Sequence, residues 1–171
     1  REKESLYVCS GILYNHESPR RPDTYVTQKI IKGLQSGECF QIGNLESRRD
    51  WGHAKDYVKA MWLLLQQEPT QTGHRLRDII IATGKTYSVR EFIEIVVKKL
   101  NKTIEWSGEG TNEVGSIDGK VVIQVSQEFY RSDNETLLVG HNQSIEEIGW
   151  TREYDIYSLI EEMIHPPQVK V

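Results

Sequence analysis

The sequence predicts an α/β protein in which strands of an open, largely parallel sheet are combined with a smaller mixed α/β part. Two observations favour this class. Residues 5–14 are mostly apolar, with small residues between them and no turn signal before Asn15, which is typical of a buried parallel strand. Short apolar strands then alternate with amphipathic helices along the 171 residues, a length that suits one domain.

The first half of the chain predicts two helices around a short strand. Residues 24–36 have apolar side chains at helical spacing, with Thr24 as the candidate cap and Gly37 as the stop. Residues 38–42 read as a strand that ends in a turn. Residues 53–67 predict a second amphipathic helix. Its buried face is expected to carry Ala54, Val58, Met61, Trp62 and Leu65, with Trp62 in the core.

The second half predicts a strand at residues 78–83 and a helix that starts at a capping box formed by Ser88 and Glu91. Strands at residues 103–106 and 120–125 are expected to flank a Gly-rich acidic loop at residues 107–119. Two further helices are predicted at residues 144–148 and 154–164, and the first of them ends at Gly149.

Composition and charge narrow the function classes. The net charge of −4 argues against nucleic acid as a general partner, because a polyanion binder needs a basic surplus on one face. No apolar run approaches the roughly 20 residues that span a bilayer, and no signal peptide precedes the first strand, so we expect a cytoplasmic protein without a membrane partner.

Basic residues in separate loops predict an anion site. Arg21 ends the stretch NHESPRR (residues 15–21), which follows the first strand, and Arg49 lies in RRDWG (residues 48–52). Arg131 follows two aromatic residues, and Lys29 lies within the first predicted helix. Arginine binds phosphate oxygens through a fixed bidentate fork, so a pyrophosphate is the natural ligand. The alternative is that all four are solvated surface cations.

The neighbouring polar residues leave alternatives open. Asn15 could bond a phosphate or a sugar hydroxyl, or simply form a turn. His16 could donate to a cofactor or cap its loop, and a role as general base is disfavoured. His53 and Asp56 have metal-ligand spacing but no third ligand, which favours a structural role. We expect no metal site and no catalytic residue in this chain.

Several motifs that are typical of cofactor-binding and catalytic sites are missing from the sequence. No G-x-G-x-x-G follows a strand and no P-loop is present. A Tyr-x-x-x-Lys pair on a helix is not expected either. The sequence therefore suggests the half of an enzyme that holds the substrate, and acid–base or hydride chemistry would have to come from elsewhere.

Three stretches carry a resemblance to a known family: NHESPRR (15–21), RDWGHAKDYV (49–58) and IATGKTYSVREF (81–92), followed by LLVGHNQSIEEIGW (137–150). In this order they resemble the carboxyl-terminal half of the GDP-mannose 4,6-dehydratase family. The resemblance implies the carboxyl-terminal part of an extended Rossmann-like (short-chain dehydrogenase) fold with a small mixed α/β substrate-binding domain. Residues 1–171 would be this half, without the part that carries the cofactor fingerprint.

The resemblance also implies ligands and residue roles. It places His16 and Arg21 against NADP, and Asn15, Lys29, Arg49 and Arg131 around GDP-mannose. The product would be GDP-4-keto-6-deoxymannose on the way to GDP-fucose, and the full-length protein would be a dimer or tetramer. The family often has Pro-Thr-Glu after the last arginine, whereas this chain has Ser132-Asp133-Asn134 and then Glu135, so Asp133 or Glu135 is the candidate ribose-binding carboxylate.

Two rival hypotheses accompany this one. The chain could be a non-catalytic module that binds nucleotide sugars, or it could belong to a related epimerase or dehydratase that acts on another sugar. In each case this portion alone is expected to be inactive.

Overall fold

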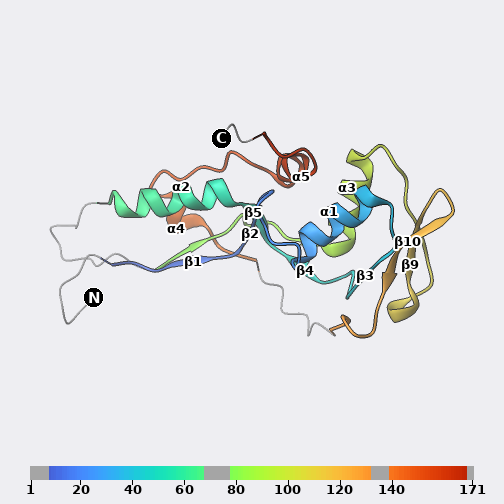
Figure 1. Ribbon diagram of the computed structural model, residues 1–171. Coiled ribbons are helices and arrows are strands. Elements are labelled where there is room, and N and C mark those ends of the chain that lie inside the picture. Colours follow the sequence, from blue (N-terminus) through green and yellow to red (C-terminus); the bar gives the residue numbers. More distant parts are fainter. Residues whose placement is uncertain (1–7, 68–77, 132–138, 169–171) are drawn as a thin grey trace.

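The computed structural model describes residues 8–67, 78–131 and 139–168. Two groups of elements lie at opposite ends of an elongated molecule: β1, α2 and α4 at one end, and β3, β9 and β10 at the other (Figure 1). The elements are β1 (Gly11–Leu13), β2 (Asn15–Glu17), α1 (Val26–Ser36), β3 (Phe40–Ile42), β4 (Arg48–Arg49), β5 (Trp51–His53), α2 (Ala54–Leu65), β6 (Ile79–Ile81), β7 (Tyr87–Ser88), α3 (Val89–Lys99), β8 (Glu105–Ser107), η1 (Gly110–Asn112), β9 (Val114–Ile117), β10 (Lys120–Val125), α4 (Gln143–Glu146) and α5 (Ile156–Ile164).

Parallel and antiparallel strand pairs both occur, as expected for this fold class. β1 pairs with β6 and β2 pairs with β5, each in parallel, while β4 and β7 pair antiparallel. The remaining strands form a four-stranded sheet in the order β3-β10-β9-β8, in which β3 is parallel to β10 and the other pairs are antiparallel. The prediction of a mixed α/β architecture is therefore confirmed.

The ends of the helices follow local chemistry. The predicted capping box is present at the start of α3, where Ser88 Oγ accepts from the Glu91 amide at 3.0 Å and Glu91 Oε2 accepts from the Ser88 amide at 2.6 Å. Gly37 ends α1 in the left-handed conformation, as expected. Thr24 does not cap α1, because the helix begins one residue later with Tyr25 at the capping position and no side-chain cap.

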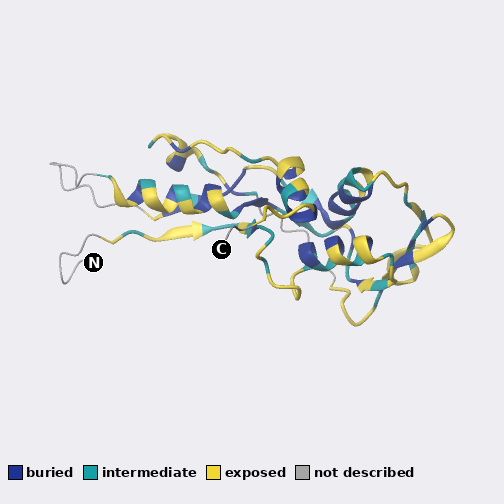
Figure 2. Cartoon of the chain, turned by 45° about the horizontal axis from the view of Figure 1, so that its top comes forward, coloured by how far each residue is buried: buried dark blue, intermediate teal, exposed yellow. Residues whose placement is uncertain are grey.

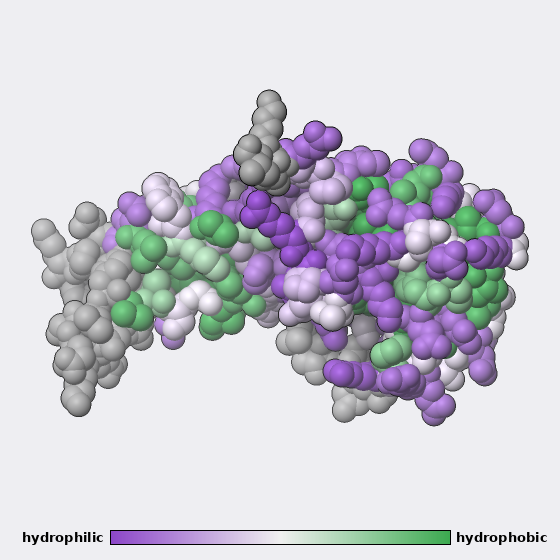
Figure 3. Space-filling model, viewed as in Figure 1, coloured by the Kyte–Doolittle hydropathy of each residue, from purple (hydrophilic) through white to green (hydrophobic). Residues whose placement is uncertain are grey.

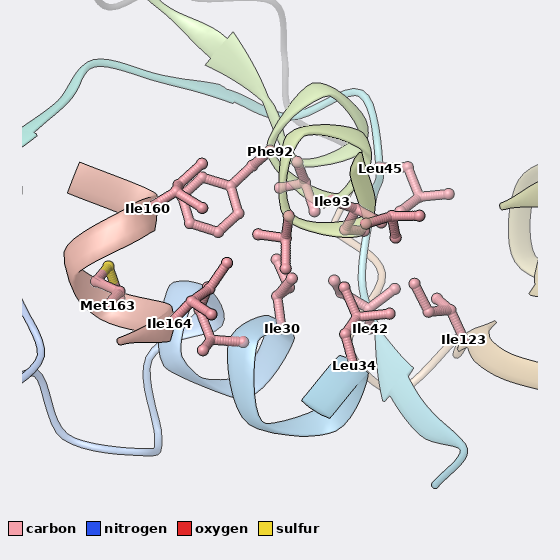
Figure 4. Close-up of a cluster of buried hydrophobic side chains, with 14 of the residues drawn as sticks. Ile30, Leu34, Ile42, Leu45, Phe92, Ile93, Ile123, Ile160, Met163 and Ile164 are labelled. Carbon is pink, nitrogen blue, oxygen red and sulfur yellow. The ribbon is translucent and has the colours of Figure 1, made fainter. Parts of the chain in front are cut away.

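Two hydrophobic clusters hold the chain together. The larger one fills the space between α1, α3 and α5 and reaches the four-stranded sheet, and its centre includes Ile30, Phe92 and Ile160, each fully buried (Figure 4). The smaller cluster lies beneath α2 and contains Tyr57, Ile81 and Trp150. Burial of this apolar surface is the main source of stability.

Three expectations about local structure were wrong. The NHESPRR stretch is not entirely a loop, since Asn15–Glu17 form β2. The expected loop at residues 107–119 contains β9, which pairs with β10 through a tight turn where Asp118 and Gly119 both have positive φ (51° and 76°), as a two-residue hairpin requires. β1 is parallel to β6 but is not buried, because Ile12 is 51% exposed.

The predicted face of α2 was also wrong. Tyr57, Ala60 and Leu64 are buried, together with Asp56, whereas Val58, Met61, Trp62 and Leu65 are exposed (Figure 2). Both sides of this helix are apolar, so periodicity alone could not show which side meets the sheet.

Candidate functional site

A groove of about 290 Å³ opens where β3, β4, the start of α1 and the segment after β10 converge. Its polar lining includes Arg49 and Arg131, two of the arginines that the sequence analysis placed around an anion. Residues from four separate parts of the chain line it: Val26, Ile42, Gly43, Asn44, Ser47, Arg49, Trp51, Val89, Glu128, Phe129 and Arg131. The groove therefore combines apolar walls with cationic and carboxylate groups.

Arg48 and Arg49 are adjacent in β4, and the short ladder between β4 and β7 gives them different contacts. Arg48 is opposite Ser88 and Arg49 is opposite Tyr87. Because successive side chains of a strand point to opposite faces, the two guanidinium groups separate. Arg48 turns toward the start of α3 and pairs with Glu91 at 2.9 Å. Arg49 lines the groove, and its Nη1 donates to the Arg48 carbonyl oxygen at 2.7 Å, which fixes its side chain.

A second wall of the groove comes from the segment after β10. Gly43 allows this segment to lie close to the end of β3, because a Cβ at position 43 would lie 2.3 Å from the Phe129 carbonyl oxygen. Asn44 Nδ2 donates to the Arg131 carbonyl oxygen at 3.4 Å, and Lys29 Nζ lies 4.4 Å from the centroid of the Phe129 ring. Lys29, Arg49 and Arg131 are thus brought to the same region, as an anion site requires.

Asn15 and His16 lie on β2, outside the lining of this groove. The parallel ladder with β5 places Asn15 opposite Trp51, which does line the groove, and His16 opposite Gly52. His16 Nδ1 donates to the Tyr14 carbonyl oxygen at 2.9 Å, and its ring stacks on Tyr57 at 5.0 Å between centroids. The ladder between β2 and β5 therefore places Asn15 and His16 next to the segment that lines the groove.

Arg21 is held by the buried carboxylate of Glu17. Arg21 Nε lies 3.3 Å from Glu17 Oε2 without hydrogen-bond alignment, so the contact is a charge pair and this buried nitrogen makes no hydrogen bond. The guanidinium carbon lies 3.5 Å from the centroid of the Tyr25 ring. Thr27 Oγ1 donates to the same carboxylate at 2.7 Å. Burial raises the pKa of Glu17, and the bond from Thr27 and the charge of Arg21 oppose that rise.

Tyr25 and Lys29 have the Tyr-x-x-x-Lys spacing, but α1 begins at Val26 with Tyr25 at its capping position, so the two residues do not form such a pair within a helix. Tyr25 precedes the first turn of α1 and its ring faces Arg21, while Lys29 faces Phe129. The Tyr25 ring and the Lys29 ammonium group therefore contact different residues, and the spacing does not form a shared catalytic site.

A buried carboxylate that was not anticipated connects the candidate site to the sheet. Asp50 is 1% exposed; its Oδ1 accepts from the Thr83 amide at 2.8 Å and from Thr83 Oγ1 at 2.6 Å, and its Oδ2 accepts from the Gly84 amide at 2.9 Å. These bonds tie the residue next to Arg49 to the end of β6. The position of an acid between two arginines and a tryptophan in RRDWG was the available signal for this role.

His53 and Asp56, the pair with metal-ligand spacing, both have structural partners. His53 Nδ1 caps α2 by accepting from the Lys55 amide at 3.1 Å, and its Nε2 meets Glu162 Oε2 at 3.1 Å. Asp56 accepts from the amides of Glu153 and Tyr154. Among residues 8–67, 78–131 and 139–168, no group of three or more His, Cys, Asp or Glu side chains could hold a metal ion.

Two further expectations concern the ribose-binding carboxylate and membrane-spanning helices. Asp133 and Glu135, the candidate ribose-binding carboxylates, lie outside the described residues. Within the described parts of the chain, no helix is both long enough and apolar enough to cross a bilayer.

Comparison with solved structures identifies the class of fold. The RMD protein from Pseudomonas aeruginosa, complexed with NADPH, matches 95% of this chain and 48% of its own chain with a TM-score of 0.67 at 17% identity. A dTDP-glucose 4,6-dehydratase from Bacillus anthracis, in complex with NAD, matches 95% of this chain and 45% of its own with a TM-score of 0.69 at 14% identity. The chain therefore shares its Rossmann-like α/β fold with about half of each of these proteins.

Sequence comparison then identifies the family. The family model described as GDP-mannose 4,6 dehydratase matches residues 1–163. A curated GDP-mannose 4,6 dehydratase from Dictyostelium discoideum is 42% identical over 172 residues, which cover 96% of this chain and 47% of that protein. The chain belongs to the GDP-mannose 4,6-dehydratase family, and it spans about half the length of this relative.

Proposed function

We propose that this chain is the carboxyl-terminal, substrate-binding half of a GDP-mannose 4,6-dehydratase. In the complete enzyme GDP-mannose would lose water to give GDP-4-keto-6-deoxymannose, which is a lyase reaction. The observation that carries the proposal is the groove lined by Arg49 and Arg131, beside Lys29, in a chain of this family. A pyrophosphate needs such groups, because moving its two charges out of water costs several kcal/mol unless cations and donors replace the solvent.

The substrate residues divide by chemistry. Arg49 and Arg131 offer planar forks to the phosphate oxygens, and Lys29 adds a compact charge near the same wall. Asn15, opposite Trp51 in the ladder, would present its amide to the sugar nucleotide from the neighbouring strand. The rigid ladder beneath these groups keeps them in place before the ligand arrives, which reduces the ordering cost of binding.

The cofactor residues fit a supporting contact with NADP. His16 uses Nδ1 for the Tyr14 carbonyl oxygen, which orients Nε2 away from its own strand. The Arg21 guanidinium lies beside the buried carboxylate of Glu17, and its buried Nε makes no hydrogen bond. When bound, the nicotinamide group would accept hydride and return it. The two residues bind and orient only, and we assign no catalytic residue to this chain.

The remaining features of the proposed protein follow from the family. We propose a cytoplasmic, homo-oligomeric enzyme of GDP-fucose synthesis that has no nucleic-acid or membrane partner. The phosphate-binding fingerprint and the proton-transfer groups would lie in the other half, so residues 1–171 alone would be inactive.

Replacing Arg49 tests the substrate assignment. In the complete protein, Arg49→Ala should weaken GDP-mannose binding by about 1.5 to 3 kcal/mol, which is about 10- to 150-fold, because a charge-assisted bond to phosphate is lost. Titration calorimetry measures the affinity, and NADP affinity should stay the same. Arg20→Ala is the matched control, since Arg20 is exposed and lies outside the groove. Unchanged GDP-mannose affinity in Arg49→Ala would refute the assignment.

The choice of sugar needs a separate measurement. Incubating the complete protein with GDP-mannose, UDP-sugars and dTDP-sugars and measuring product mass distinguishes the alternatives. A mass loss of one water from GDP-mannose alone supports the proposal. Turnover of another nucleotide sugar would favour a related dehydratase or epimerase, and binding without any product would favour a non-catalytic module.

A further inference from the structure

The ring of Tyr57 lies against His16, the residue that the proposed function places beside NADP. The two ring centroids are 5.0 Å apart and the ring planes differ by 28°, so the rings are stacked. Tyr57 belongs to α2 and is 1% exposed, whereas His16 lies on β2 and is half-buried. The contact therefore joins the hydrophobic cluster beneath α2 to a candidate cofactor residue.

The ladder between β2 and β5 leaves room for this contact. Gly52 is the residue opposite His16. A Cβ at position 52 would lie 2.5 Å from Tyr57 Cε2 and 3.0 Å from the Tyr57 hydroxyl oxygen, which is too close for a side chain. A glycine within a strand is typical of a position that another group approaches closely. The Tyr57 ring therefore occupies the space that a side chain opposite His16 would need.

The residues on either side of Tyr57 face elsewhere. Asp56 faces the segment after α4, where Trp150 Nε1 donates to the Asp56 carbonyl oxygen at 2.8 Å. Val58 is 61% exposed, and the space-filling view shows hydrophobic residues on the surface at this end of the molecule (Figure 3). Of these three consecutive residues, Tyr57 is the one whose ring contacts His16. The bond to Asp56 holds this part of α2 in place beneath the ladder.

The aromatic ring of Tyr57, rather than its hydroxyl group, makes this contact. Among the described residues, the buried hydroxyl oxygen has no hydrogen-bond partner. Burial and, to a smaller extent, the charge of Asp50 raise the pKa of Tyr57, so the phenol stays protonated and does not act as a base. The flat face of the ring is the part of Tyr57 that meets His16.

Two contacts together fix the His16 ring. Nδ1 donates to the Tyr14 carbonyl oxygen at 2.9 Å, and the Tyr57 ring covers one face of the imidazole. We infer that Tyr57 is a positioning residue for the cofactor, because it holds the His16 ring in the orientation that binds NADP while being too buried to bind NADP itself. A ring that is fixed beforehand lowers the ordering cost of binding. The inference rests on the cofactor role of His16 in the proposed function.

Titration of the complete protein with NADPH, followed by calorimetry, tests this role. Tyr57→Leu should weaken NADPH binding about three- to ten-fold, the range expected when one aromatic pair is lost. Tyr57→Phe should restore the affinity to within about two-fold of wild type, because the ring remains and the hydroxyl group has no partner to lose. Tyr57→Met is a second variant if Tyr57→Leu does not fold, since methionine fills the space without a flat ring. It should weaken NADPH binding as Tyr57→Leu does.

Leu64→Ala is the matched control for a general loss of packing. Leu64 lies on the same helix as Tyr57, about two turns further along, and belongs to the same buried cluster. Both Tyr57→Leu and Leu64→Ala should lower the urea midpoint of unfolding, as large-to-small substitutions in a core do. Leu64→Ala should change NADPH affinity by less than about two-fold, because it leaves the stacked rings in place. An equal loss of NADPH affinity in both variants would overturn the inference.

A double-mutant cycle shows whether Tyr57 acts through His16. In a protein that already carries His16→Ala, Tyr57→Leu should weaken NADPH binding by less than about two-fold, since the ring that it supports is gone. The inference is overturned if Tyr57→Leu has its full effect in that background. It is also overturned if neither Tyr57→Leu nor Tyr57→Met weakens binding when His16 is present, or if Tyr57→Phe weakens it as much as Tyr57→Leu does.

The single variant His16→Ala separates this inference from the proposed function. It should weaken NADPH binding, because the proposed cofactor contact is removed. If His16→Ala weakens binding and Tyr57→Leu does not, the cofactor assignment of His16 stands and the positioning role of Tyr57 is wrong. If His16→Ala binds NADPH as tightly as wild type, the cofactor assignment itself is contradicted, and the positioning role is contradicted with it.

Discussion

Lys29 and Phe129 meet across the edge of the groove, with Lys29 Nζ 4.4 Å from the centroid of the aromatic ring. The contact joins α1 to the segment after β10, two parts of the chain that are distant in sequence. A cation over an aromatic face is favourable by roughly 0.5 to 1 kcal/mol at an exposed site. The ring therefore holds the ammonium group at the mouth of the groove rather than letting it extend into solvent.

If this ammonium faces the pyrophosphate, Lys29→Met should weaken GDP-mannose binding about five-fold and make it less sensitive to salt, because one cation is removed. Lys29→Arg should retain most of the affinity. Calorimetric titrations of the complete protein at two salt concentrations give both quantities. Lys32→Met is the control, since Lys32 lies on the same helix and pairs with Asp23. Equal effects of Lys29→Met and Lys32→Met would argue against a direct role for Lys29.

The sequence predicted that Arg21, Arg49 and Arg131 converge; the groove brings Arg49 and Arg131 together, although Arg49 lies on β4 rather than in a loop and Arg21 is not among the lining residues. The residues that support these cations could not be predicted from the sequence. Gly43 and Asp50 act through contacts with Phe129 and Thr83, which are distant in sequence, and no local pattern reveals such pairs. The orientation of α2 was missed for a related reason. Both of its sides are apolar, so the choice between them depends on which surface the rest of the protein covers.

The loss of the Asp50 carboxylate should weaken the support of Arg49. In Asp50→Asn, one oxygen becomes an NH₂ group that faces either the Gly84 amide or the Thr83 donors, so at least one buried bond is lost and two donors meet. We expect the free energy of unfolding to fall by about 2 to 3 kcal/mol, as for a buried bond to a charged acceptor. Urea denaturation measures this change.

The control for this change is Asp118→Asn, because Asp118 is exposed in a hairpin turn with positive φ, a conformation that asparagine also adopts. It should alter the free energy of unfolding by less than about 0.5 kcal/mol. If Asp50→Asn is equally neutral, the carboxylate does not hold the end of β6 as the geometry indicates.

The hydrogen bonds of His53 indicate that it is neutral in the folded protein. Its Nδ1 accepts from the Lys55 amide, so the proton of the neutral ring is on Nε2, which donates to Glu162 Oε2 at 3.1 Å. Burial lowers the pKa of His53 from its usual 6.5, and the nearby Glu162 carboxylate only partly opposes this shift. Burial works against ionisation of Glu162 as well, but its bonds from Lys55 and His53 prevail and its pKa is lowered.

The lowered pKa of His53 predicts a loss of stability in mild acid. Because the unfolded chain binds the proton more readily than the folded one, the free energy of unfolding should fall as the pH drops below about 6.5. The loss is at most about 1.4 kcal/mol per pH unit and stops once the pKa in the folded protein is passed. In His53→Asn, asparagine can still cap α2 but does not titrate, so the loss between pH 7.5 and 5 should be smaller.

Urea denaturation of both proteins at pH 7.5, 6.5, 5.5 and 5 measures this difference. The range stays above the window in which the lowered pKa of Glu162 matters, because that contribution is lost only as the pH falls below about 4.5. His165→Asn is the matched control, since the His165 side chain is 70% exposed. It should follow the wild-type pH dependence. If His53→Asn follows it as well, the buried ring is not the group that makes the fold sensitive to acid.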